Sequence, residues 1–173
     1  MPKIIPELKD RFVAAAKRRL LETNDITIRQ VAQDCDTAVG TVYNYFPSKE
    51  ALLAEVMMTD WRICCEHMRI GAAKSEGPLE ALRVTVMALR EFTAKYALLW
   101  RNYAGVGDSM EVLNSRHHII IAEIAAAASQ TLDRFGVQGD AYLPEVLAEL
   151  ILYASRTDDG FDRITGVLRK ILA

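Results

Sequence analysis

Residues 27–52 read TIRQVAQDCDTAVGTVYNYFPSKEAL, and this stretch decides the fold of the chain. Ile28, Val31 and Ala32 have the i, i+3, i+4 spacing of one apolar helix face. Thr27 stands directly before them, where its hydroxyl can accept a hydrogen bond from a free backbone N–H as an N-cap. The pattern therefore predicts a short helix that starts after Thr27.

A second short helix is predicted from Ala38 to Phe46, after a turn formed by DCDT at 34–37, whose Asp or Thr side chain can cap it. At about 100° per residue, Val42 and Phe46 lie on one side of this helix and face the core. The opposite side carries small and polar residues, which are Gly40, Thr41 and Asn44. Two short helices joined by a tight turn form the helix-turn-helix arrangement that enters a major groove.

The side chains beside this outward surface are suited to phosphate contact. The rings of Tyr43 and Tyr45 can lie on protein while their hydroxyls reach phosphate oxygens. Pro47 ends the helix, Ser48 is expected to cap the next one, and Lys49 stands in its first turn.

These residues resemble the DNA-binding segment of the tetracycline-repressor (TetR) family. The resemblance rests on three groups, which are Thr27 with Val31-Ala32, the run GTVYNYF at 40–46, and the run SKEAL at 48–52. It covers about the first third of the chain. Two positions depart from the family's pattern, because Asp36 stands where Gly is common and Ala38 where Ser is common. These departures concern the turn geometry and one phosphate contact.

The rest of the chain is expected to be helical, since no alternating pattern typical of a strand occurs in it. Helices are predicted over residues 7–22, from Ser48 for about 25 residues, and from Pro78 towards Tyr96 or Trp100. A long helix is predicted from a cap at Asp108 or Ser109 to near Phe135, and two more over residues 144–156 and 161–172. The sequence therefore predicts an all-α fold in which an N-terminal three-helix helix-turn-helix domain continues into a long helix. The resemblance implies a DNA-binding domain over residues 1–52 and a C-terminal ligand-binding and dimerisation bundle over residues 53–173.

The DNA contacts are expected from the second helix and its neighbours. Arg29 can donate two hydrogen bonds to a guanine, while Val39 and Thr41 can contact thymine methyls or base edges. Phosphates are expected at Thr27, Tyr43, Tyr45 and Lys49. The predicted DNA-binding residues are Thr27, Arg29, Ala38, Val39, Gly40, Thr41, Tyr43, Asn44, Tyr45 and Lys49.

Charge gives little support to DNA binding. Residues 1–49 contain eight Lys or Arg and six acidic residues, a net charge of +2, and the whole chain has a net charge of −2. Phosphate neutralisation supplies much of the affinity of DNA-binding proteins, so few phosphate contacts per subunit are expected. The cluster Lys17-Arg18-Arg19 can supply extra backbone contacts or form an ordinary solvated helix face.

Several other classes of protein are disfavoured. The longest apolar run, Ile119 to Ala128, is ten residues long and contains Glu123, too short to span a bilayer. No signal segment opens the sequence, so a cytoplasmic location is expected. The three cysteines fit neither a disulfide framework nor a zinc site and are interpreted as small buried hydrophobes. No nucleophile pattern or Gly-rich phosphate loop indicates an enzyme, and no metal or cofactor is expected.

Large or polarisable side chains in the second half can line a cavity for a mostly hydrophobic or aromatic small molecule, or form plain core. The candidates are Trp61, Met68, Phe92, Tyr96, Trp100, Tyr103, Met110 and His117. The resemblance implies that the last two helices pair across a two-fold axis. Ala148, Leu152, Ser155 and Gly166 suit such packing, or the core of a single chain.

The sequence thus favours a ligand-responsive transcriptional repressor that binds a palindromic operator on double-stranded DNA as a homodimer and is released by a small, largely apolar molecule. The alternative is a helical small-molecule or partner-binding module whose helix-turn-helix no longer functions, which the weak basic charge favours.

Overall fold

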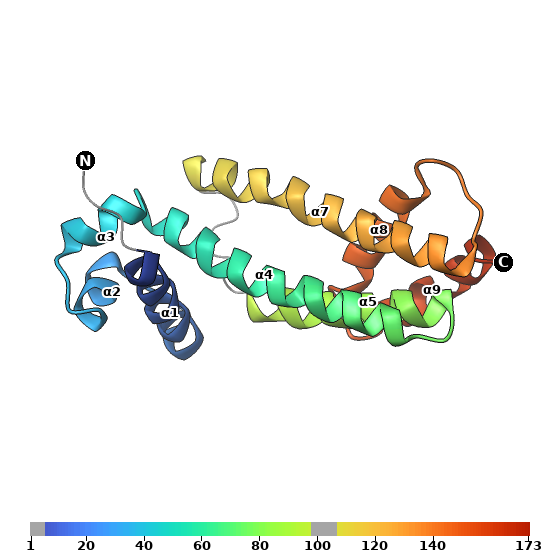
Figure 1. The fold of residues 1–173 in the computed structure, drawn as a ribbon, viewed down its shortest axis with the longest axis horizontal. Coiled ribbons are helices and arrows are strands. Elements are labelled where there is room, and N and C mark those ends of the chain that lie inside the picture. Colours follow the sequence, from blue (N-terminus) through green and yellow to red (C-terminus); the bar gives the residue numbers. More distant parts are fainter. Residues whose placement is uncertain (1–5, 98–106) are drawn as a thin grey trace. The chain divides into compact units, whose positions relative to one another are not determined.

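A computed structural model of the chain describes residues 6–97 and 107–173, with side chains over residues 7–97 and 118–173. Eight helices make up most of this part, and it contains no strand, so the predicted all-α fold is confirmed (Figure 1). In chain order they are α1 (Pro6–Thr23), α2 (Ile28–Asp34), α3 (Val39–Tyr45), α4 (Lys49–Lys74), α5 (Pro78–Lys95), α7 (Gly107–Phe135), α8 (Leu143–Ala154) and α9 (Gly160–Ile171).

The described residues form two compact units. The first contains residues 6–60 and 107–113, and the second contains Trp61–Ala97 and Asn114–Ala173. The long helix α4 contributes its first turns to the first unit and its remainder to the second. The sequence placed a domain boundary after residue 52. That boundary stays a prediction, and the compact units divide α4 between Asp60 and Trp61.

The core of the first unit is built from the apolar faces of α1, α2 and α3 and the first turns of α4. Helix α1 turns Phe12 and Ala16 fully inward, and α3 does the same with Val42. The other buried side chains of this core are Leu20, Ile28, Val31, Phe46, Leu52 and Val56. A helix of seven residues is marginal alone, so α2 and α3 depend on this packing for their stability.

In the second unit, α5 and α7 both lie along α4. The Cys64 thiol on α4 donates to the Ala88 carbonyl on α5, while Cys65 donates to Glu123 on α7. Helices α8 and α9 pack against each other and against α5. A Cβ at Gly160 would collide with the Ala154 carbonyl, so a glycine is needed where α9 begins beside the end of α8. Within the described ranges, no helix is long and apolar enough to cross a bilayer.

Candidate functional site

The helix-turn-helix begins with a complete capping box at α2. The Thr27 hydroxyl accepts the Gln30 backbone N–H at 3.2 Å, and the Gln30 side chain accepts the Thr27 N–H at 3.0 Å. The predicted N-cap is therefore confirmed. In the turn, Asp36 has φ of 52° and occupies the left-handed region. Asp tolerates this conformation better than most non-glycine residues, so the turn is made without the family's common glycine.

The caps of the next two helices differ from each other. Ala38 is the N-cap of α3, and no side chain caps that helix, so the expected cap by Asp36 or Thr37 is wrong. The Thr37 hydroxyl instead donates to the Ala32 carbonyl at 3.4 Å, because Thr37 still belongs to the turn that leaves α2. The cap predicted for α4 is confirmed, since the Ser48 hydroxyl accepts the Ala51 N–H at 3.1 Å.

The face of α3 opposite its core contact is open. Val39 is 39% exposed and Tyr43 is 49% exposed, whereas Val42 is fully buried. Ala38, Gly40 and Asn44 are also exposed, and Thr41 and Tyr45 are half-buried. The Tyr45 ring meets the edge of Phe12 with centroids 5.5 Å apart, which ties that side of α3 to α1. Helix α3 thus offers a continuous outward surface of small, polar and aromatic side chains.

Most cations of the first unit are occupied by acceptors of the same unit. Arg19 donates to both carboxylate oxygens of Asp34 at 2.7 and 2.6 Å, and Arg18 reaches the same carboxylate at 3.2 Å. Lys17 pairs with buried Asp60. The remaining pairs are Lys9 with Glu55 at 3.0 Å, Lys49 with Asp25 at 2.6 Å, and Arg11 with the Cys35 carbonyl at 2.8 Å. The cluster Lys17-Arg18-Arg19 therefore links α1 to the rest of the unit.

Arg29 differs from these cations. Its side chain is exposed on α2. It is the one basic side chain between residues 7 and 60 that has no hydrogen-bond or ion-pair partner in the described part of the chain. Its guanidinium is available to an outside acceptor.

The Arg19–Asp34 pair predicts an acid-dependent loss of stability. The two arginines, Arg19 first, lower the pKa of Asp34 from its ordinary 3.8 to about 2. A carboxylate with a lowered folded-state pKa stabilises the fold above its unfolded pKa, and this contribution disappears as the pH falls through the folded value. The difference in the free energy of unfolding between the native protein and Asp34→Asn should be constant above about pH 5 and shrink between about pH 4 and pH 2.

Urea titrations at stepped pH measure this difference. Asp10→Asn, which changes an exposed carboxylate on the same helix as Arg19, is the matched control. If the difference in the free energy of unfolding between the native protein and Asp34→Asn stays constant down to pH 2, the ion pair adds nothing to stability.

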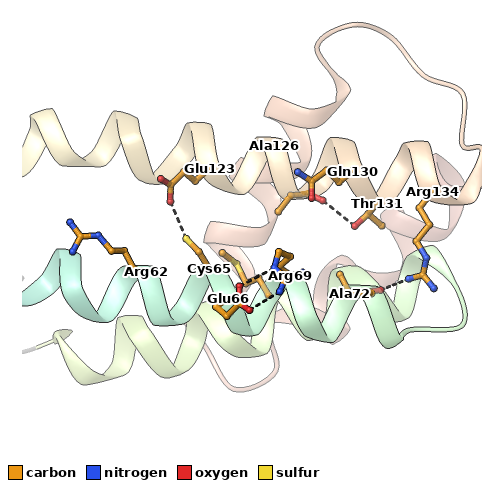
Figure 2. A pocket seen from close by; sticks show the side chains of 13 residues that line it. Arg62, Cys65, Glu66, Arg69, Ala72, Glu123, Ala126, Gln130, Thr131 and Arg134 are labelled. Atoms are coloured by element: carbon orange, nitrogen blue, oxygen red, sulfur yellow. Dashed lines mark hydrogen bonds and ion pairs between the residues drawn. The ribbon is translucent and has the colours of Figure 1, made fainter.

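A groove lies between α4 and α7 within the second unit (Figure 2). Its volume is about 620 Å³, within the range of small-molecule sites. Met68 and Thr131 are the buried residues of its lining, and the charged lining residues are exposed, so the groove is open to solvent. Its lining consists of Arg62, Cys65, Glu66, Met68, Arg69, Ala72, Ala73, Glu123, Ala126, Ala127, Gln130, Thr131 and Arg134.

Of the predicted ligand-binding residues, Met68 lines this groove. Trp61, Phe92 and Tyr96 lie elsewhere, in a buried aromatic cluster with successive ring centroids 5.2 Å apart. The indole N–H of Trp61 donates to the Glu123 carboxylate, which connects the cluster to the groove wall. Trp100 and Tyr103 lie outside the described residues. Met110 and His117 belong to α7 at positions where only the backbone is described.

The sequence interpretation missed the polar residues of the groove. Arg62, Arg69 and Arg134 stand on exposed helix faces, where they cannot be distinguished from solvated charges in the sequence. The alanine run 125–128 was a usable signal. Ala125 and Ala128 are buried, whereas Ala126 and Ala127 line the groove and leave it open.

The cysteines partly follow the expectation of small buried residues. Cys35 and Cys64 are buried, and Cys65 is half-buried at the groove. Burial raises the pKa of the Cys64 thiol to about 12, and burial together with the hydrogen bond to Glu123 raises the pKa of Cys65. Both thiols remain protonated at neutral pH. The described residues contain no group of three or more side chains able to hold a metal ion.

Helices α8 and α9 carry apolar side chains on their outer surface as well as in the core. Tyr142 is 75% exposed, Val146 on α8 is 51% exposed, and Val167 on α9 is 50% exposed. Tyr153 is also exposed, and spacings of four and seven residues place Tyr142, Val146 and Tyr153 along one side of α8. By contrast, Ala148, Leu152 and Ser155 are buried inside the chain, so they belong to the core of the unit. Gly166 is exposed.

Comparison with known proteins agrees with the helix-turn-helix geometry. Residues 18–56 match the sequence profile of the bacterial regulatory proteins of the tetR family. No curated protein sequence matches the chain.

Solved structures share the fold over nearly the whole chain. GusR of Salmonella enterica is 20% identical with a TM-score of 0.67, covering 99% of this chain and 98% of its own. RolR in complex with resorcinol is 17% identical with a TM-score of 0.65, over 97% and 88%. FadR of Bacillus subtilis in complex with stearoyl-CoA is 14% identical with a TM-score of 0.61, over 95% and 97%. Residues 18–56 thus carry the helix-turn-helix of the tetR family of bacterial regulatory proteins, and the chain shares the all-α fold of these solved structures.

Proposed function

We propose that the chain is a ligand-responsive repressor that binds a palindromic operator as a homodimer in the cytoplasm and is released by a small molecule bound in the α4–α7 groove. The observation that carries the proposal is the exposed outward face of α3, together with the exposed guanidinium of Arg29 on α2, which has no partner among the described residues. The other described cations of the first unit already have partners inside it, so recognition depends on a few specific contacts.

In the proposed complex, α3 enters the major groove. Arg29 donates two hydrogen bonds to a guanine, and exposed Val39 with half-buried Thr41 contacts thymine methyls or base edges. Tyr43 and Lys49 hold phosphates, as do Thr27 and Tyr45. Ala38, Gly40 and Asn44 keep the helix surface low enough for the bases to approach. The base contacts set the preferred sequence, and the phosphate contacts set the register.

The homodimer is proposed to form through α8 and α9. Exposed Val146 and Val167 offer apolar surface that a second copy would cover. One seven-residue recognition helix makes few contacts with DNA, whereas two related by a two-fold axis match half-sites about 34 Å apart.

Release by ligand is proposed to depend on α4, the element shared by both units. A ligand that prefers one position of α4 over another by about 1 to 3 kcal/mol changes operator affinity by the same free energy. RolR with resorcinol and FadR with stearoyl-CoA are structural neighbours bound to small molecules, which supports a ligand site in this chain.

The alternative is a helical small-molecule or partner-binding module that does not bind DNA. The intramolecular pairing of the first unit's cations favours it. Selection of fragments from a random DNA pool by the purified protein separates the two functions. We expect a palindrome with half-sites one helical turn apart and an affinity that falls with salt. A pool without enrichment, or an interaction independent of salt, would favour the module.

The Asp25–Lys49 pair predicts a variant that binds DNA more tightly. Asp25 accepts from Lys49 at 2.6 Å and from the Ile26 N–H at 2.8 Å. Asp25→Asn keeps an acceptor for Ile26 and removes the charge that competes with phosphate for Lys49. Operator affinity at low salt is expected to rise by about three- to ten-fold, and the slope of log affinity against log salt should steepen by about 0.9.

Fluorescence anisotropy with a labelled operator at several salt concentrations measures both quantities. Asp133→Asn, which removes an exposed carboxylate of the second unit, is the control of equal charge change. An unchanged slope in Asp25→Asn would exclude Lys49 as a phosphate contact.

A further inference from the structure

The α4–α7 groove has an apolar floor and a charged rim. Four alanines face it, at positions 72, 73, 126 and 127, and their small side chains leave the space that larger residues would fill. Met68 supplies a polarisable surface between them. A slim or flat apolar body fits such a floor. The rim carries three arginines and two glutamates, so its formal charge is +1 when all are ionised.

Most of these charges already have partners inside the chain. Arg69 donates to both carboxylate oxygens of Glu66 at 2.9 and 2.6 Å. Arg134 donates to the Ala72 carbonyl and, at 2.9 Å, to the Ser75 carbonyl, where it satisfies the C-terminal end of α4. Glu123 accepts from Trp61 and Cys65.

Arg62 is the exception on the rim. It is exposed, and it has no hydrogen-bond or ion-pair partner in the described part of the chain. Figure 2 shows it at the Glu123 end of the groove, without an interaction with any of the other side chains drawn. An unpaired guanidinium beside an apolar floor is a receptor for a planar or tetrahedral anionic group.

We propose that the effector is an amphipathic monoanion, whose apolar body lies over the alanine floor and whose negative group binds Arg62. The inference rests on the proposed function, since it assigns the chemistry of the ligand to the same groove. It replaces the largely apolar molecule expected from the sequence with one that carries a carboxylate, sulfonate or phosphate ester. The single charge matches the excess charge of the rim.

Two fluorescent probes test the charge requirement. 1-Anilinonaphthalene-8-sulfonate and N-phenyl-1-naphthylamine share one aromatic body and differ in the sulfonate. Because the neutral probe is the more apolar of the two, the readout is the change that each substitution makes in the ratio of their dissociation constants. Arg62→Met should raise the dissociation constant of the sulfonate probe by about three- to ten-fold and change that of the neutral probe by less than about two-fold.

A variant expected to tighten binding of the sulfonate probe distinguishes a specific effect from a general loss of structure. Glu66→Gln releases the Arg69 guanidinium from its ion pair and should raise the affinity for the sulfonate probe by about two- to three-fold. Ala126→Leu fills the floor without a charge change and should weaken both probes. Arg83→Met removes an exposed arginine of α5 outside the groove and should leave both dissociation constants unchanged.

The outcomes separate cleanly. The proposal is overturned if Arg62→Met weakens both probes equally or neither, or if Ala126→Leu leaves the sulfonate probe bound as before, because the anion would then bind elsewhere. These measurements contain no DNA. A failure here leaves the repressor function standing, and a failure of the DNA selection leaves the anion site standing.

Discussion

Glutamate at both Val146 on α8 and Val167 on α9 is expected to leave the protein monomeric and to weaken binding to a palindromic operator by about a hundred-fold or more. Each side chain is about half-exposed in the single chain, so the change should not disturb the fold. In a two-fold dimer each position occurs twice, so four negative charges would meet at the interface and lose their hydration. Sedimentation velocity measures the oligomeric state, and anisotropy measures the affinity.

A control is Met87→Glu, which adds one negative charge per chain, against two in the double variant, on an exposed apolar residue of α5. It should leave both oligomeric state and affinity nearly unchanged. A duplex with a single half-site adds a second control, because the double variant and the native protein should bind it with similar affinity. A double variant that remains dimeric would place the interface outside α8 and α9.

The sequence predicted the helix-turn-helix well because its determinants are local. The capping box of Thr27 and Gln30 spans four residues, and the inward positions Val42 and Phe46 follow from the helix period. The cap of α3 was the local exception. Ala38 takes the N-cap position one residue after Thr37, so a side chain suited to capping stands one place too early.

The ion pairs of the first unit could not be predicted in the same way. Asp34 and Arg19 are 15 residues apart, and Lys17 and Asp60 are 43 apart, so their meeting depends on how α1 packs. In the sequence the cluster at 17–19 is equally compatible with phosphate contact and with a solvated face. The packing of α1 decides between these by bringing carboxylates to all three side chains.

The groove shows a different limit of sequence interpretation. Large side chains are natural candidates for a ligand site, yet they fill space, and here Trp61, Phe92 and Tyr96 fill the core of the second unit. A hollow forms where volume is missing, as beside Ala126 and Ala127. Pairs of consecutive small residues on two neighbouring helices, as at 72–73 and 126–127, are therefore the better signal.

Arg29→Ala is expected to remove most of the preference for one base pair in each half-site while leaving affinity for unrelated DNA nearly unchanged. A guanidinium that donates two hydrogen bonds to guanine distinguishes that base by about 1 to 3 kcal/mol, or about five- to 150-fold. Arg29 is exposed and has no partner in the described part of the chain, so its truncation should leave the free energy of unfolding unaltered. Competition between the selected operator and duplexes altered at single base pairs measures the preference.

Tyr43→Phe is the matched comparison, because it removes one hydroxyl from the exposed face of α3 and keeps the ring. A phosphate contact carries no sequence information, so this variant should lower the affinity for all duplexes by the same factor. If Arg29→Ala also weakens every duplex equally, Arg29 binds phosphate, and the base contacts must come from Val39 and Thr41. If it changes none of them, the guanidinium does not reach the DNA, and the orientation proposed for α3 in the major groove is wrong.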